Sequence, residues 1–483
     1  MERKFLWETY DENQLRNMNE VNERYKNCLN VGKTERECVT LATKMAQEAG
    51  YVDLKDVKEV KPGSKIYTTY NNKTIALFNI GTDPIEDGMN ILGAHIDSPR
   101  LDIKQNPLYE AQGFSYLDTH YYGGIKKYQW VTIPLAIHGV IVKKDGTVVN
   151  VCVGEKEDDP VFTITDLLVH LAQEQMQKKA NVVIEGENLD LLVGSVTDNG
   201  EDVKERVKSN TMKLLSEMYG IEEEDFLSAE LEVVPADKAR DLGFDRSMVL
   251  AYGQDDKICA WTSLFAMLNV ENPTRTSCTL LVDKEEIGSV GASGMHSHFF
   301  ENMLAEILYL MGKESDIAVR RTLAHSTMLS SDVSAGFDPL FPDKFEAKNS
   351  AFLGKGIVFN KFTGSRGKSG SNDANAEYMA KIRKVMDDNN VAFQTAELGK
   401  VDVGGGGTIA YIMANYGMEV IDAGLAVLCM HSPAEISSKA DVYEAVRAYE
   451  AFLRDMKEAR GAHHESLLTC LAFFKSLHHF ICE

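Results

Sequence analysis

The chain has 483 residues, 44% of them hydrophobic, and carries a formal net charge of −22. This length allows two domains, and the negative charge argues against nucleic acid and anionic membranes as partners. The start of the chain lacks the apolar core of a signal peptide, and no run of about 20 apolar residues predicts a membrane span. Because the eight cysteines include no CxxC pair, we expect a cytoplasmic protein with reduced thiols.

Five segments along the chain share one pattern, an apolar run that ends in His, Asp or Glu beside small residues. They are residues 91–99 (ILGAHIDSP), 249–257 (VLAYGQDDK), 279–289 (TLLVDKEEIGS), 328–336 (MLSSDVSAG) and 424–433 (GLAVLCMHSP). The apolar runs predict buried strands. In open α/β sheets ligands bind at the carboxyl ends of the strands. We therefore expect the polar side chains of these segments to meet at one edge of a sheet.

A long gap separates the first of these segments from the second. Within it, two β-rich runs at 130–142 and 148–154 flank Asp145-Gly146, which is a strong hairpin signal, and helical and acidic stretches follow. We predict a discontinuous catalytic domain at 1–100 and 245–460, interrupted by a β-rich insertion at 101–244. Residues 461–483 would form a C-terminal extension.

Histidines and carboxylates at strand ends suit a pair of divalent ions, with zinc as the first choice. The adjacent residues Glu285 and Glu286 are the most informative, because one carboxylate can bind an ion while its neighbour moves a proton of water. A single His or Asp of this kind is more often structural. Five segments with the same pattern make that alternative hard to sustain.

These segments resemble the aspartyl aminopeptidase family of di-zinc metallopeptidases. The matching motifs, in the family's order, are residues 94–99 (AHIDSP), 253–257 (GQDDK), 283–289 (DKEEIGS), 331–335 (SDVSA), 402–408 (DVGGGGT) and 430–435 (MHSPAE). The resemblance implies an α/β fold, in which a mixed-sheet catalytic domain with helices on both faces is interrupted by a β-rich dimerisation domain.

The resemblance also implies which residues bind the two ions: His95, Asp255, Glu286, Asp332 and His431. Asp255 would bridge the ions, because one carboxylate can give an oxygen to each metal of a pair. His95 and Asp332 would complete one set of ligands, and Glu286 and His431 the other. A cis peptide bond is expected after Asp255.

Three further residues have implied roles. Asp97 would accept the imidazole N–H of His95 and fix its tautomer. Glu285 would be the general base, taking a proton from the metal-activated water and delivering it to the leaving amine. His138 matches a family histidine that enters the neighbouring subunit's site and helps to stabilise the oxyanion. The alternative for His138 is a strand histidine whose partners are local.

The expected function is that of a zinc-dependent aminopeptidase that hydrolyses the N-terminal residue of peptides, with manganese or cobalt as alternative ions. The resemblance implies dimers that build a tetrahedral dodecamer. A preference for Asp or Glu is implied by the family, and the basic segment 354–368 could supply a cation. The family's basic residue near this segment falls at or beside Asn360, however, so a leucine-type preference stays open.

Two other functions stay open, a di-metal carboxypeptidase or deacylase and a catalytically silent assembly scaffold. Retention of Glu285 argues against the scaffold, because a scaffold needs no general base. The glycines at 404–407 lack the spacing of a phosphate-binding loop. We expect them to let the backbone approach the substrate closely.

Overall fold

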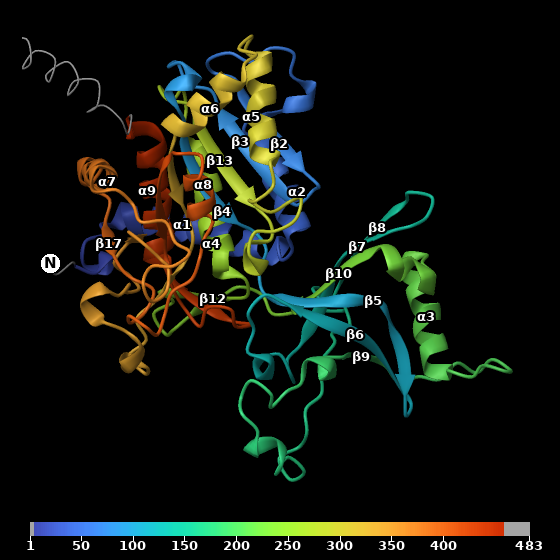
Figure 1. Cartoon of the computed structure of the whole chain (residues 1–483). Coiled ribbons are helices and arrows are strands. Elements are labelled where there is room, and N and C mark those ends of the chain that lie inside the picture. Colours follow the sequence, from blue (N-terminus) through green and yellow to red (C-terminus); the bar gives the residue numbers. More distant parts are fainter. Residues whose placement is uncertain (1–3, 458–483) are drawn as a thin grey trace, which may run out of the picture.

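The structure, a computed structural model, describes residues 4–457. In this part of the chain the strands form three sheets, of nine, six and five strands, with helices packed on the largest (Figure 1). The expected α/β architecture is confirmed. None of the helices within 4–457 combines the length and apolar character that crossing a membrane requires. The C-terminal extension predicted at 461–483 lies outside the described residues.

The nine-stranded sheet is mixed, and its four central strands run parallel. Those four are buried almost throughout, which explains why they read as unbroken apolar runs. In spatial order the strands are β1 (Val52–Asp53), β2 (Lys65–Tyr70), β3 (Thr74–Asn79), β13 (Ser277–Val282), β4 (Asn90–His95), β14 (Thr327–Ser330), β18 (Glu419–Gly424), β16 (Ile357–Asn360) and β17 (Phe393–Thr395).

Helices cover both faces of this sheet, because alternate residues of each strand point to opposite cores. On β4, Leu92 and Ala94 belong to one core and Ile91 to the other. The first core contains side chains of α1 (Glu12–Val31), α2 (Glu35–Glu48), α4 (Gln254–Asn269), α7 (Ala376–Asp388) and α9 (Lys439–Asp455). The second contains those of α5 (Phe299–Leu310), α6 (Asp316–His325) and α8 (Ala410–Ala414).

The six-stranded sheet is antiparallel and extends to one side of the helix-covered sheet (Figure 1). The hairpin expected at Asp145-Gly146 is present, because the strands on either side of this turn pair along their length. Helix α3 (Arg206–Tyr219) packs on this sheet. Its strands in spatial order are β8 (Val148–Val153), β7 (Leu135–Val142), β10 (Ala229–Pro235), β5 (Arg100–Ala111), β6 (Phe114–Tyr122) and β9 (Leu191–Gly194).

The five-stranded sheet holds two segments that lead to the predicted metal ligands. Asp255 follows one of its strands, and His431 lies between two others. In spatial order the strands are β11 (Arg240–Leu242), β12 (Met248–Ala251), β20 (Glu435–Ser438), β19 (Ala426–Leu428) and β15 (Ser334–Ala335). Strand β11 lies within the range predicted for the insertion, yet it pairs with β12 outside that range.

Candidate metal and catalytic site

All five predicted metal ligands come together at one place. His95 ends β4, Asp332 follows β14, and Glu286 lies in the short 3-10 helix that follows β13. Asp255 and His431 approach from the five-stranded sheet. Asp255 lies in the first turn of α4, where the expected cis peptide bond joins it to Asp256. The ligands thus converge from two sheets, although the strand-end pattern predicted a single sheet edge.

Asp255 is at the centre of this cluster. Its Oδ1 atom lies 3.3 Å from Nε2 of His95, and its Oδ2 atom lies 3.2 Å from Nε2 of His431. On the first side, His95 Nε2 is also 3.9 Å from Oδ1 of Asp332. On the second, His431 Nε2 is 3.5 Å from Oε2 of Glu286. The ligand-type atoms therefore form two adjoining sets that share one carboxylate.

The electrostatics of the cluster favour a bound cation. Burial, together with the charges of neighbouring carboxylates, raises the pKa values of Glu286 and Asp332 well above the ordinary range for these residues. Positive charge between the carboxylates would remove this penalty. Within residues 4–457, Oε1 of Glu286 is also buried with no hydrogen-bond partner. The imidazole and carboxylate groups of the cluster, with an oxygen of Glu286 free to bind an ion, are ligands that zinc accepts.

Glu285 is placed to move a proton beside the cluster. Its Oε2 atom lies 3.9 Å from Nε2 of His95. Its side chain lines a cavity of about 630 Å³ that also includes Asp255, Glu286, Asp332 and His431. Burial, opposed by the charge of His95 and reinforced by that of Asp97, raises the pKa of Glu285 to about 7. A carboxylate in such a setting is suited to general-base chemistry.

Asp97 is packed against His95 as expected. Nδ1 of His95 lies 3.1 Å from the backbone oxygen of Asp97 and 3.3 Å from its Oδ1 atom. The Asp97 carboxylate also accepts hydrogen bonds from the backbone N–H groups of Glu285 and Glu286, each at 3.1 Å. Asp97 therefore connects a predicted ligand to the segment that carries the predicted base.

Glu435 is a residue of the site to which the sequence pattern assigned no role. Its carboxylate accepts hydrogen bonds from the backbone N–H of Asp255 at 3.0 Å and from that of His431 at 2.7 Å. It thereby ties together the chain segments of two ligands. Glu435 lies within the MHSPAE motif, but a sequence does not reveal that its partners are backbone groups. Tyr122 and Gly124 were missed for a similar reason, because they contact the site from the six-stranded sheet.

His138 lies outside the cluster, buried on β7. Its Nδ1 atom is 2.7 Å from Oε1 of Glu37, and its Nε2 atom is 3.0 Å from Oε1 of Glu155. Both ring nitrogens therefore have partners within the same chain, which favours the local alternative. The role of His138 in a neighbouring subunit's site stays a prediction.

Two loop predictions concern the cavity. The glycines at 404–407 line it, together with Val403 and Thr408, as expected for backbone that approaches a substrate. The basic segment 354–368 contributes no residue to the lining of this cavity. Its Lys361 and Lys368 both pair with Asp373.

Comparison with known proteins decides the family. A family model described as Aminopeptidase I zinc metalloprotease (M18) matches residues 28–453. The chain belongs to the M18 family of aminopeptidases. A probable M18 family aminopeptidase 1 from Clostridium acetobutylicum is 59% identical to it over 458 residues, which cover 94% of this chain and 98% of that protein.

Solved structures agree with the M18 assignment. The M18 family aminopeptidase from Thermotoga maritima has a TM-score of 0.91 at 45% identity, covering 94% of this chain and 100% of that one. The mApe1 dodecamer of S. cerevisiae shares the fold, with a TM-score of 0.72 at 20% identity over 90% of this chain and 96% of that one. The protein is a zinc metalloprotease that acts as an aminopeptidase, which confirms the resemblance seen in the motifs.

Proposed function

We propose that this M18 aminopeptidase binds two zinc ions and that Asp255 is the ligand they share. His95 and Asp332 would complete one set of ligands, and Glu286 and His431 the other. The observation that carries the proposal is that the two carboxylate oxygens of Asp255 face two different imidazoles, at 3.3 and 3.2 Å. A carboxylate in this position can give one oxygen to each ion.

When bound, the zinc ions polarise the scissile carbonyl and lower the pKa of water. The chain itself moves the proton. Glu285 takes it from the attacking water and then delivers it to the leaving amine. Asp97 positions His95 and Glu285 relative to each other. Its carboxylate contacts the His95 ring and accepts a hydrogen bond from the backbone N–H of Glu285. Glu435 keeps the segments of Asp255 and His431 together.

We propose further that the enzyme prefers substrates with a neutral N-terminal side chain. Apolar side chains of the cavity include Val333, Phe345, Leu398 and Val403. Lys344 is the one lysine or arginine among its described lining residues, and its Nζ atom is 2.7 Å from Oδ2 of Asp343. An acidic substrate side chain would therefore meet no uncompensated cation there, and its desolvation would be unfavourable.

We also propose that the protein forms a homo-oligomer through its six-stranded sheet. Six apolar side chains in the segment between β8 and β9 are more than half exposed: Val161, Leu167, Leu168, Val169, Leu171 and Met176. Exposed apolar clusters of this kind mark interaction surfaces. We propose that residues 101–244 form the predicted dimerisation unit and that dimers assemble into a dodecamer.

The test is a substrate panel with metal-depleted and zinc-reconstituted enzyme. The substrates are p-nitroanilides and short peptides with Leu, Ala, Asp or Glu at the N-terminus, with N-acetylated controls. We expect activity to be restored at two zinc ions per chain, and cleavage of Leu and Ala substrates to exceed that of Asp and Glu. Faster cleavage of Asp and Glu would contradict the neutral preference.

The N-acetylated controls test the requirement for a free N-terminal amine. We expect the enzyme to leave them uncleaved. Full activity with one zinc ion per chain would refute the two-ion proposal.

A further inference from the structure

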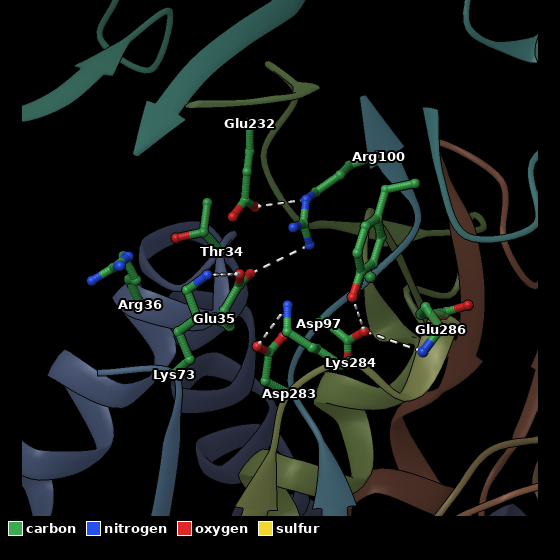
Figure 2. Close-up of polar contacts among 12 residues, drawn as sticks. Thr34, Glu35, Arg36, Lys73, Asp97, Arg100, Glu232, Asp283, Lys284 and Glu286 are labelled. Atoms are coloured by element: carbon green, nitrogen blue, oxygen red, sulfur yellow. Dashed lines mark hydrogen bonds and ion pairs between the residues drawn. The ribbon is translucent and has the colours of Figure 1, made fainter. Parts of the chain in front are cut away.

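The end of β6 reaches the metal cluster from the six-stranded sheet. Tyr122 is the last residue of this strand, and residues 123 and 124 lead out of it. Tyr122 contacts Asp97 and Gly124 contacts His431, and the backbone of Gly123 passes close to Glu286. Figure 2 shows Asp97 and Glu286 of this region beside Arg100 of the neighbouring strand β5.

Tyr122 contacts the carboxylate of Asp97. Its buried hydroxyl donates a hydrogen bond of 2.8 Å to Oδ2 of Asp97. The same carboxylate accepts the backbone N–H groups of Glu285 and Glu286 and lies against His95. A carboxylate held by three donors has little freedom to rotate, so the hydroxyl helps to fix the group that orients His95.

The Tyr122 ring is itself held in place. The guanidinium carbon of Arg100 lies 3.9 Å from the ring centroid, a cation–π contact. Arg100 is buried and is anchored by Glu35 at 3.4 Å and Glu232 at 3.2 Å. Burial and the charge of Asp97 raise the pKa of Tyr122, which keeps its hydroxyl protonated and able to donate.

Gly124 contacts the other set of ligands. Its backbone oxygen lies 2.8 Å from Nδ1 of His431. A carbonyl oxygen can only accept, so Nδ1 carries the hydrogen and Nε2 is left free to face Asp255 and Glu286. Between the two contacts, Gly123 has a φ of 73°, and a Cβ atom there would lie 3.4 Å from Cβ of Glu286. The backbone thus passes close to the cluster.

We propose that residues 122–124, the β6 end, are a positioning element of the zinc centre. The Tyr122 hydroxyl acts through Asp97 and His95, and the Gly124 carbonyl acts through His431. This inference rests on the metal ligands proposed above. The six-stranded sheet then contributes to catalysis as well as to the proposed assembly. The β6 end orients one metal ligand on each side of Asp255, His95 through Asp97 and His431 directly.

The first test compares Tyr122→Phe with Tyr121→Phe in the full chain. Zinc affinity is measured by competition with a chromophoric chelator, alongside kcat and KM. We expect Tyr122→Phe to weaken zinc binding by about 10- to 100-fold and to lower kcat more than it changes KM, since outer hydrogen bonds tune metal affinity by this much. Tyr121 is an exposed neighbour on the same strand, and we expect its variant to match the wild type. Equal zinc affinity in both variants would overturn the proposal.

A double-mutant cycle tests whether the hydroxyl acts through Asp97. We expect Tyr122→Phe to change zinc affinity much less in an Asp97→Asn background than in the wild type. Fully additive effects would show that the hydroxyl contributes only general stability and would overturn the Tyr122 part. If the wild-type chain bound no zinc, the proposed metal ligands would be wrong. If it bound zinc but the variants behaved additively, only the positioning role of Tyr122 would be wrong.

The contact between Gly124 and His431 is tested with Gly124→Val. This variant also keeps the proposal testable if Tyr122→Phe does not fold. Gly124 is exposed, and a Cβ atom there would lie 3.4 Å from Nδ1 of His431, so added γ-carbons would crowd the ring. With cobalt in place of zinc, we expect weaker binding and a shifted visible absorption spectrum. A wild-type spectrum and affinity would overturn the Gly124 part.

Discussion

Glu285 and Glu286 are adjacent in the chain, but their carboxylates have different partners. Oε2 of Glu286 lies 3.5 Å from Nε2 of His431, whereas Oε2 of Glu285 lies 3.9 Å from Nε2 of His95. The short 3-10 helix after β13 separates the two side chains in this way. Two chemically identical residues can therefore divide the work between metal binding and proton transfer.

Glu285→Gln tests this division. Glutamine keeps the shape of the side chain but cannot take a proton, so we expect kcat to fall by about 10²- to 10⁴-fold while the zinc content stays at the wild-type level. Steady-state kinetics and metal analysis provide the two readouts. Glu271→Gln, at an exposed position before β13, is the matched control. Wild-type turnover in Glu285→Gln would mean that another group is the base.

His138→Gln should cost stability in a pH-dependent way. Burial alone lowers the pKa of His138, but hydrogen bonds with Cys152, Glu155 and Glu37 outweigh it and raise the pKa from 6.5 to about 11. A pKa raised by folding means that the protonated ring stabilises the fold fully below pH 6.5 and that this contribution is lost as the pH rises toward 11.

We expect His138→Gln to lower the free energy of unfolding by about 3 kcal/mol at pH 7, the usual cost of breaking a buried ion pair, and by progressively less toward pH 11. Denaturant unfolding at several pH values measures this difference. His298→Gln, on an exposed side chain, is the control. A difference that did not vary with pH would contradict the charged state assigned to His138.

The sequence predicted those site residues that lie at or soon after the ends of apolar strands. His95, Glu286 and Asp332 could be found because burial on both faces makes a parallel strand apolar, so that the charged and imidazole side chains near its end stand out. Tyr122 gives no such signal, because it sits in an antiparallel strand whose buried positions include Ser115 and Thr119 and whose exposed positions include Phe114. Its contact with Asp97 depends on how two sheets are packed together, which no local pattern encodes.

At the scale of elements, Arg100 joins a helix and two strands. It begins β5, and its guanidinium pairs with Glu35 of α2 and Glu232 of β10 (Figure 2). Lys73 of the loop between β2 and β3 lies 3.9 Å from Oε1 of Glu35. This buried cluster connects the nine-stranded and six-stranded sheets close to the β6 end, so its integrity affects how the two sheets meet.

Arg100→Met should therefore destabilise the protein strongly. Removing the guanidinium leaves the buried Glu35 with little compensation, and breaking a buried pair in this way costs about 3–5 kcal/mol. Arg36→Met is the matched control, because Arg36 pairs with Glu230 at 2.7 Å in a more exposed setting and such pairs contribute about 1 kcal/mol or less. The midpoints of guanidinium chloride unfolding compare the two. Equal shifts would show that Arg100 has no special structural role.

Some elements of the fold could be predicted from the sequence and others could not. The hairpin at Asp145-Gly146 was predictable because its turn residues and flanking β-rich runs are local features. The separate five-stranded sheet was not, since its strands β12, β19 and β20 are short and the pairing of β12 with β20 joins residues far apart in the chain. The strand-end pattern alone could not distinguish one sheet edge from the meeting point of two sheets.

At the scale of the whole molecule, the exposed apolar segment between β8 and β9 is the surface through which we propose that subunits associate. Val169 and Leu171 are 72% and 69% exposed, in a segment that projects from the six-stranded sheet (Figure 1).

Replacing both Val169 and Leu171 with Asp would place charges in the proposed interface, where burying an unpaired carboxylate is unfavourable. We expect the double variant to form smaller species than the wild type in size-exclusion chromatography with light scattering, with unchanged circular dichroism. Ile317→Asp, at an exposed position on α6, controls for the added charge. A wild-type mass for the double variant would mean that the oligomer assembles through another surface.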